Sequence, residues 1–522
     1  SKFGSGAIGG VINITTKKNF INEYKIYMGG GSFGFWNVEP SITGNLNNLS
    51  YFLSYNLTQS DGDYDYNYLD TKGNNAKDER INANITMQNI FARINYKLDN
   101  YLFSVNAQRL DSERGLPGKT NALTAFAKSK IINNIFGSSI KATFNNLVIY
   151  LNGSYSQSET DNSNLYPDDA LPEYKRYPRY HYKYESDISI LNSTIHYKPL
   201  KWFYLTTGYT GKWLNYNDEN FIATLKSPIN NATDISHGLF LHQEYKVDLP
   251  KPFNKSSISP SIRYDEMRMN SGELKRFEHQ WSPSLSAFIS MGKSYKVYLK
   301  SSISRSFRVP TFSDLFYQDV RIEGKPDLLP EKSLNKEIGL GWEISAWGKL
   351  KGEINFYNYS IDNMIVWKLG SFEVFRPFNN DADITGQDYS LQYQLPNQNL
   401  SLQFSYTYLQ PLDKNNHKTT HNKIIPYRPQ HSFKSSIQFG YKETLAKINY
   451  RVVGKRFVTV ANTVELPSYQ VVDLTLLQNL NFSKLKTVLI FSVNNLINEH
   501  YEIVRSYPIP GREFRIGITL KY

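Results

Sequence analysis

The sequence predicts an all-β fold, a transmembrane antiparallel β-barrel of about 22 strands. Three observations lead to this prediction. Apolar and polar residues alternate along much of the chain, which is the period of a strand with two different faces. Short and long connections between the alternating segments follow one another in turn. No run of roughly 18 or more apolar residues occurs, so the sequence offers no membrane-spanning helix.

The last segment of the chain, 514–522, alternates most clearly. One face is apolar: Phe514, Ile516, Ile518, Leu520 and Tyr522. The other face carries Arg515, Gly517, Thr519 and Lys521. Segments 51–58, 400–408 and 433–441 repeat the pattern. About nine alternating residues are enough to cross a bilayer as a tilted strand, with the apolar face toward lipid.

The connections set the strand number. Ten are short, at 45–48, 98–100, 145–146, 199–201, 249–255, 292–294, 346–349, 396–399, 442–444 and 483–486. Eleven are longer or more polar, at 31–34, 61–80, 111–128, 159–183, 215–235, 269–277, 308–332, 362–384, 411–430, 458–467 and 499–510. Together they join about 22 strands with both barrel ends on the short-turn side; 20 or 24 strands lie within the error of the count.

Composition excludes several classes of protein. The chain has no Cys, which excludes disulfides and thiolate metal sites. Its formal charge of +12 comes without a basic run or zinc-finger spacing, so we expect no nucleic-acid partner. No hydrolase or metalloprotease motif occurs, and we expect no enzymatic activity.

Aromatic residues make up 15% of the chain. Several tryptophans lie near predicted strand ends, as in an interfacial aromatic girdle: Trp36, Trp202, Trp213, Trp342 and Trp367.

Three groups of motifs carry a family resemblance. Residues 3–18 read FGSGAIGGVINITTKK, a glycine-rich stretch before a short apolar strand, without the Gly-Lys-Ser/Thr ending of a phosphate loop. Residues 307–311 read FRVPT and are followed by KPDLLPEK at 325–332. Near the C-terminus stand VNNLINEHY at 493–501 and PIPGR at 508–512. With these motifs the chain resembles the TonB-dependent receptor family over nearly its whole length.

The resemblance implies a domain organisation, a location and partners. Residues 1–18 resemble the end of the family's plug domain and 19–522 its barrel, so we interpret the chain as lacking most of the plug, including the segment that contacts TonB. It implies active transport across the outer membrane, energised by TonB and its inner-membrane complex. Outer-membrane lipid or lipopolysaccharide, a metal-chelate ligand and a surface lipoprotein are the further partners we consider.

Several ligands and one other class of barrel remain open. A cobalamin or corrinoid is slightly favoured and a ferric siderophore is the alternative. Haem receptors of the family usually carry a His between the two halves of the paired loop motif. Residues 311–324 contain no His, so haem is disfavoured. A passive porin-like barrel would leave 3–18 and the paired loop motif without a role.

Candidate ligand-binding residues come from two long connections. Aromatic rings next to cations suit a large, partly apolar, anionic ligand. On this ground we assign Tyr166, Tyr174, Tyr177, Arg179, Arg308 and Tyr317 to ligand binding. Lipopolysaccharide contact or simple loop packing would explain the residues of 159–183 equally well.

An acidic loop is the candidate metal site. Asp61, Asp63, Asp65 and Asp78 supply carboxylate oxygens of the kind that calcium prefers, and cobalamin receptors resemble this region. A solvated acidic loop is the alternative, and no cofactor is required by either interpretation. His417 and His421 would share a face only on a helix, and their surroundings predict a loop instead.

Overall fold

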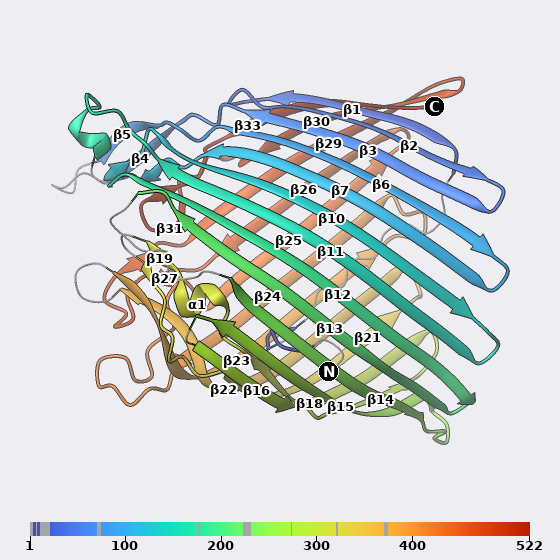
Figure 1. Cartoon of the computed structure of the whole chain (residues 1–522). Helices are drawn as coiled ribbons and strands as arrows, with labels where there is room; N and C mark the ends of the chain where they lie inside the picture. The colour runs from blue at the N-terminus through green and yellow to red at the C-terminus, as the bar shows by residue number, and fades with distance from the viewer. Residues whose placement is uncertain are drawn as a thin grey trace.

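The computed structural model describes residues 4–6, 8–10, 21–69, 75–175, 178–222, 231–272, 274–319, 322–369 and 374–522. Within these residues the chain forms a closed antiparallel barrel of 22 strands, which confirms the predicted fold class and strand number (Figure 1). No helix in this part of the chain is long and apolar enough to cross a membrane.

The barrel strands follow the order of the sequence. They are β1 (Glu23–Gly31), β2 (Trp36–Leu46), β3 (Leu49–Ser60), β6 (Ile85–Leu98), β7 (Tyr101–Gly115), β10 (Ala127–Thr143), β11 (Leu147–Asn164), β12 (Tyr180–Leu200), β13 (Phe203–Asn220), β14 (Ala232–Lys246), β15 (Phe253–Ser271), β16 (Leu274–Trp281), β17 (Ser284–Met291), β18 (Tyr295–Arg308), β21 (Glu331–Ile344), β22 (Lys349–Leu369), β23 (Phe375–Gln394), β24 (Leu400–Asp413), β25 (His431–Tyr441), β26 (Thr444–Val453), β29 (Tyr469–Phe482), β30 (Leu485–Asn494) and β33 (Glu513–Lys521). β16 and β17 both pair with β15 and act as one barrel strand interrupted at 282–283.

The first and last strands close the barrel. β1 pairs antiparallel with β33, from Lys25 opposite Lys521 to Gly31 opposite Arg515, while its other edge pairs with β2. Closure satisfies the backbone groups of both strands, which a membrane interior requires because it offers no water to an open edge.

All ten predicted short turns lie at the predicted positions, at one end of the barrel. Polar residues at several of them adopt the left-handed conformation, including Asn47, Asp99, Lys442 and Ser483. Asn and Asp tolerate positive φ better than other non-glycine residues, and such residues make tight hairpins whose twist matches the flanking strands. Turn chemistry therefore fixes this end of the barrel locally.

The opposite end, which we call the long-loop end, carries the remaining elements (Figure 1). They are β4 (Tyr64–Leu69), β5 (Asn75–Arg80), β8 (Gly118–Lys119), β9 (Ala122–Leu123), the short 3-10 helix η1 (Pro172–Lys175), α1 (Phe312–Phe316), β19 (Gln318–Asp319), β20 (Ile322–Glu323), β27 (Arg456–Phe457), β28 (Glu465–Leu466), β31 (Glu502–Val504) and β32 (Tyr507–Pro508).

The predicted strand boundaries were wrong at this end. Segment 362–384, predicted as a loop, is largely a continuation of β22 and β23, and β11 and β12 extend into the two ends of 159–183, as far as Asn164 and from Tyr180. Beyond the lipid both faces of a strand meet water, so the apolar alternation that marks a strand disappears, although the ladder of hydrogen bonds continues.

Apolar side chains face outward around the barrel wall, as predicted for β33. Ile516 on β33 is 68% exposed and Val105 on β7 is 60% exposed. Trp36 and Trp202 are also exposed. Trp367 does not belong to an aromatic girdle, because its indole N–H points to a carboxylate of the long-loop end.

The N-terminal part of the chain contacts the inside of the barrel. We call residues 4–6 and 8–10 the inner segment; Ser5, Gly6 and Ile8 all bond to residues of β18, β21 or the loop after β18. The predicted boundary between 1–18 and 19–522 falls within 11–20, outside the described residues, and stays a prediction.

Candidate ligand-binding site

A cluster of charged side chains holds the connection between β18 and β21. Arg308, the last residue of β18, donates from Nη1 to Asp314 Oδ2 at 2.9 Å and from Nη2 to Glu331 Oε1 at 2.8 Å. Asp314 lies in α1 and Glu331 begins β21, and both carboxylates are buried. One guanidinium thus pairs with two carboxylates at once, as its planar fork allows.

Further donors fix the two carboxylates. Asp314 Oδ2 accepts the backbone N–H and the hydroxyl of Thr311, which caps α1, and Oδ1 accepts the indole N–H of Trp367 at 3.2 Å. Burial alone would raise the pKa of Asp314, but the Thr311 hydrogen bonds and the Arg308 charge lower it. Glu331 also accepts the backbone N–H of Ile365 at 2.7 Å. We call Arg308, Thr311, Asp314, Glu331 and Trp367 the Arg308 cluster.

The loop that follows Arg308 packs on an apolar core. We call its described residues, 308–319 and 322–332, the roof loop. Phe307, Val309, Phe312, Leu315 and Leu328 are at most 6% exposed and pack with Ala232, Met269 and Ile365. The roof loop is therefore a folded unit over the wall formed by β13–β16 and β22.

Aromatic stacking joins the roof loop to β12 and β13. The ring of Tyr317 stacks on Tyr184 with centroids 5.9 Å apart, and Phe312 stacks on Tyr216 at 5.7 Å. Arg308 and Tyr317, both assigned to ligand binding from the sequence, thus lie in one packed unit with intramolecular partners. Their ligand role stays a prediction; the stacked residues Tyr184 and Tyr216 gave no sequence signal beyond strand alternation.

A second group from the predicted site lies between β11 and β12. The Arg179 guanidinium stands over the Tyr166 ring, 5.0 Å from its centroid, and Nε donates to the Tyr166 carbonyl at 2.8 Å. Arg179 also pairs with the exposed carboxylate of Asp168. Tyr174 packs edge-on against Phe126. The structure thus brings Tyr166 and Arg179 together, while Tyr177 lies outside the described residues.

The acidic loop folds into the β4–β5 hairpin. Asp65 lies opposite Glu79 and forms an exposed 2.6 Å ion pair with Lys77, whereas Asp78 lies opposite Tyr66. Neighbouring positions of a strand point to opposite faces, so Asp65 and Asp78 occupy different faces of the hairpin. In this register Asp65 and Asp78 do not converge.

Two further observations bear on metal binding. Within the described part of the chain, no group of three or more His, Asp or Glu residues is arranged to hold a metal ion. His417 contacts the Thr419 hydroxyl and His421 the Asn415 carbonyl, so the two imidazoles have separate partners. Calcium binding by the acidic loop stays a prediction.

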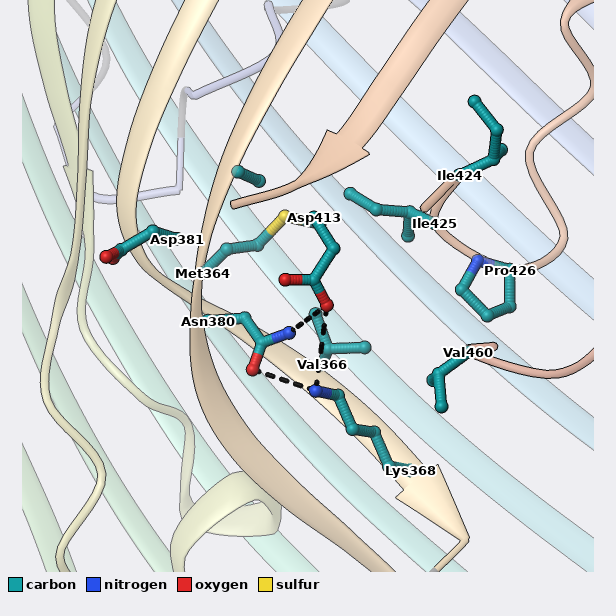
Figure 2. A pocket seen from close by; sticks show the side chains of 11 residues that line it. Met364, Val366, Lys368, Asn380, Asp381, Asp413, Ile424, Ile425, Pro426 and Val460 are labelled. Carbon is teal, nitrogen blue, oxygen red and sulfur yellow. Dashed lines mark hydrogen bonds and ion pairs between the residues drawn. The ribbon is translucent and has the colours of Figure 1, made fainter. Parts of the chain in front are cut away.

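A buried polar group that the sequence did not indicate lies between β22, β23 and β24 (Figure 2). Lys368 Nζ donates to Asn380 Oδ1 at 2.8 Å and lies 3.9 Å from Asp413 Oδ2, which accepts from Asn380 Nδ2 at 2.7 Å. Burial lowers the pKa of Lys368, and the Asp413 charge partly offsets this effect. The group ties the end of β24 to β22 and β23.

Fold and site together define an outer-membrane β-barrel protein: a closed barrel with an apolar exterior and folded loops at one end. Residues 106–496 match the family described as "TonB dependent receptor-like, beta-barrel". The chain belongs to this family, which consists of transporters and receptors rather than enzymes.

Curated relatives match the whole chain at low identity. The chain is 22% identical over 535 residues to the "Vitamin B12 transporter BtuB" of Vibrio vulnificus, covering 100% of this chain and 77% of the relative. The protein of the same name from Photobacterium profundum matches with the same identity and coverage.

Solved structures share the fold. "Copper transporter OprC" aligns with a TM-score of 0.76 at 14% identity, over 97% of this chain and 80% of that one. The unliganded "ferric citrate transporter FecA" aligns with a TM-score of 0.74 at 13% identity, over 100% and 82%. At these identities the likeness extends to the fold alone.

Proposed function

We propose that this receptor imports a cobalamin or related corrinoid across the outer membrane, energised by TonB. One observation carries the choice of ligand: the match to two vitamin B12 transporters runs through the entire chain. Transport by a TonB-dependent receptor follows from the family itself.

The long-loop end offers suitable chemistry for such a ligand. A corrinoid presents flat apolar surface together with amide groups and a phosphate. The Tyr166 ring next to the Arg179 cation provides apolar contact and a phosphate partner on one connection. Asp168, which pairs with Arg179, is 95% exposed and would be readily displaced by a competing anion.

A ferric siderophore is the second candidate. The solved structures with the same barrel include an iron citrate transporter and the FrpB iron transporter of Neisseria meningitidis. An anionic iron chelate would also find the Tyr166 ring and the Arg179 cation complementary.

Binding to the purified receptor separates the two candidates. The receptor, produced as its gene encodes it, is titrated in detergent with cyanocobalamin and, separately, with ferric citrate and a ferric catecholate. Submicromolar binding of cyanocobalamin alone supports the proposal. Binding of an iron chelate without cyanocobalamin, by a barrel shown folded from its heat-modifiable gel mobility, would refute the corrinoid assignment and leave transport intact.

A further inference from the structure

Three hydrogen bonds join the inner segment to the root of the roof loop. Gly6 N–H donates to the Phe307 carbonyl at 3.0 Å, and Val309 N–H donates to Ser5 Oγ at 3.2 Å. The Asn335 side chain of β21 donates to the Ile8 carbonyl at 3.2 Å. The first two contacts belong to the residues on either side of Arg308, so the inner segment is bonded to the backbone that carries this side chain.

The Arg308 side chain, in the middle of residues 307–309, is bonded within the Arg308 cluster to elements of the long-loop end. Arg308 binds one carboxylate from α1 and one from β21, and these in turn bind Trp367 and the Ile365 backbone of β22. A displacement of α1 or of the upper part of β22 therefore acts on the Arg308 side chain. Phe307 and Val309 are 3% and 4% exposed and pack in the apolar core, so a displacement of the backbone at Arg308 also changes their contacts.

We propose that Arg308 is a positioning residue that couples the roof loop to the inner segment, so that a change at the outer mouth is transmitted into the barrel lumen. The inference deepens the proposed function and rests on it, since it assigns Arg308 a part in import and not only in the stability of the roof loop. In this role Arg308 acts through its chain neighbours Phe307 and Val309.

A labelling experiment without ligand tests the link. A Cβ placed on Gly9 meets no atom within 4 Å, and residues 1–522 contain no Cys, so Gly9→Cys introduces the only thiol within these residues, on the inner segment. Adding Arg308→Gln should raise the maleimide reactivity of this thiol about ten-fold, because two buried carboxylates lose their partner. Ser5→Ala, which removes a single hydrogen bond and leaves the barrel wall unchanged, should raise it roughly two- to ten-fold.

The matched control is Arg268→Gln. Arg268 also pairs with a glutamate, Glu266 at 2.7 Å, but its side chain is 63% exposed. This variant should leave the thiol reactivity unchanged. Arg308→Lys keeps the charge but cannot bind two carboxylates as the guanidinium does. Its thiol reactivity should lie between those of wild type and Arg308→Gln.

Transport supplies a readout that a folding defect would not produce. Arg308→Gln should lose roughly ten-fold or more of its energised uptake per cyanocobalamin bound, with uptake and binding measured on the same preparation. Unchanged thiol reactivity in both Arg308→Gln and Ser5→Ala, with the roof loop of Arg308→Gln opened to protease, would overturn the coupling. Failure of wild type to bind cyanocobalamin would remove the corrinoid assignment only, because the labelling comparison uses no ligand.

Discussion

Trp367 donates its indole N–H to Asp314 across 53 residues of sequence, at 3.2 Å. This hydrogen bond joins the upper part of β22 to α1 and completes the set of donors around a buried carboxylate. Arg308 and Thr311 supply the others. Because Arg308 also pairs with Glu331, the FRVPT and KPDLLPEK motifs form one spatial unit, and a residue outside both motifs completes it.

Trp367→Phe should loosen the roof loop without unfolding the barrel. A hydrogen bond to a charged group contributes about 1.5–3 kcal/mol, so amide exchange at Asp314 and Leu315 should accelerate by roughly ten- to hundred-fold. Hydrogen exchange followed by mass spectrometry measures this. Trp347→Phe is the control, since Trp347 is 87% exposed; equal exchange in both variants would contradict a role for the Trp367 bond.

The Arg308 cluster should be insensitive to pH across the neutral range. The pKa of Asp314 is lowered in the folded loop, so the stability it contributes is present above the unfolded pKa of about 3.9 and is lost as pH falls through the folded value. Protease resistance of the roof loop should therefore stay constant from about pH 8 to pH 5 and decline only below roughly pH 4. A decline centred near pH 6.5 would point to a histidine instead.

The short-turn end of the fold was predictable because its signals are local. Alternation and the Asn- and Asp-containing turns identified all ten hairpins and therefore the strand number. The strand ends were not predictable at the long-loop end, where solvent on both faces removes the alternation from β11, β12, β22 and β23.

The candidate site was predictable only in part, because its contacts cross the barrel. Tyr166 and Arg179 were found from one stretch of sequence and do lie together. The stacking of Tyr317 on Tyr184 depends on the roof loop folding toward β12 and β13, which no local pattern encodes. The carboxylates of 61–78 alternate along the sequence, but the register of the β4–β5 hairpin decides which of them share a face.

Calcium binding by the acidic loop should depend on some of these carboxylates and not on others. Asp78 Oδ1 accepts the Glu79 N–H and Oδ2 accepts the Tyr66 hydroxyl, whose pKa burial and the Asp78 charge raise to about 12. We therefore expect Asp61→Asn and Asp63→Asn to weaken calcium binding roughly ten-fold and Asp78→Asn to leave it unchanged. Calorimetric titration with calcium alone measures the affinity. If wild type released no heat, the acidic loop would be a solvated hairpin without a calcium site.

Arg179→Gln should weaken cyanocobalamin binding through loss of the cation beside Tyr166. A charge-assisted contact to a phosphate contributes about 1.5–3 kcal/mol, so the Kd should rise by roughly ten-fold or more. Arg376→Gln is a suitable control, because Arg376 forms a comparable exposed pair with Glu323 on a different connection. The same rise in both variants would indicate a general charge effect and not a site at Arg179.

Val105→Arg tests the placement of the membrane on the barrel wall. Val105 is 60% exposed on the outer face of β7, five residues into a strand that starts at the short turn after Leu98, which places it near the middle of the apolar band. An arginine at the midplane costs about 2–4 kcal/mol in a barrel of this kind, falling toward zero at the interfaces. The free energy of unfolding in phospholipid vesicles, measured by denaturant titration, should drop by that amount in Val105→Arg and by little in Val105→Leu.

The control is Arg109→Lys, four residues further along the same outward face. It should cost almost nothing, because Arg109 already pairs with Asp111 and is 53% exposed in the polar part of the wall. If Val105→Arg were as stable as Val105→Leu, the apolar band would have to be placed elsewhere on β7.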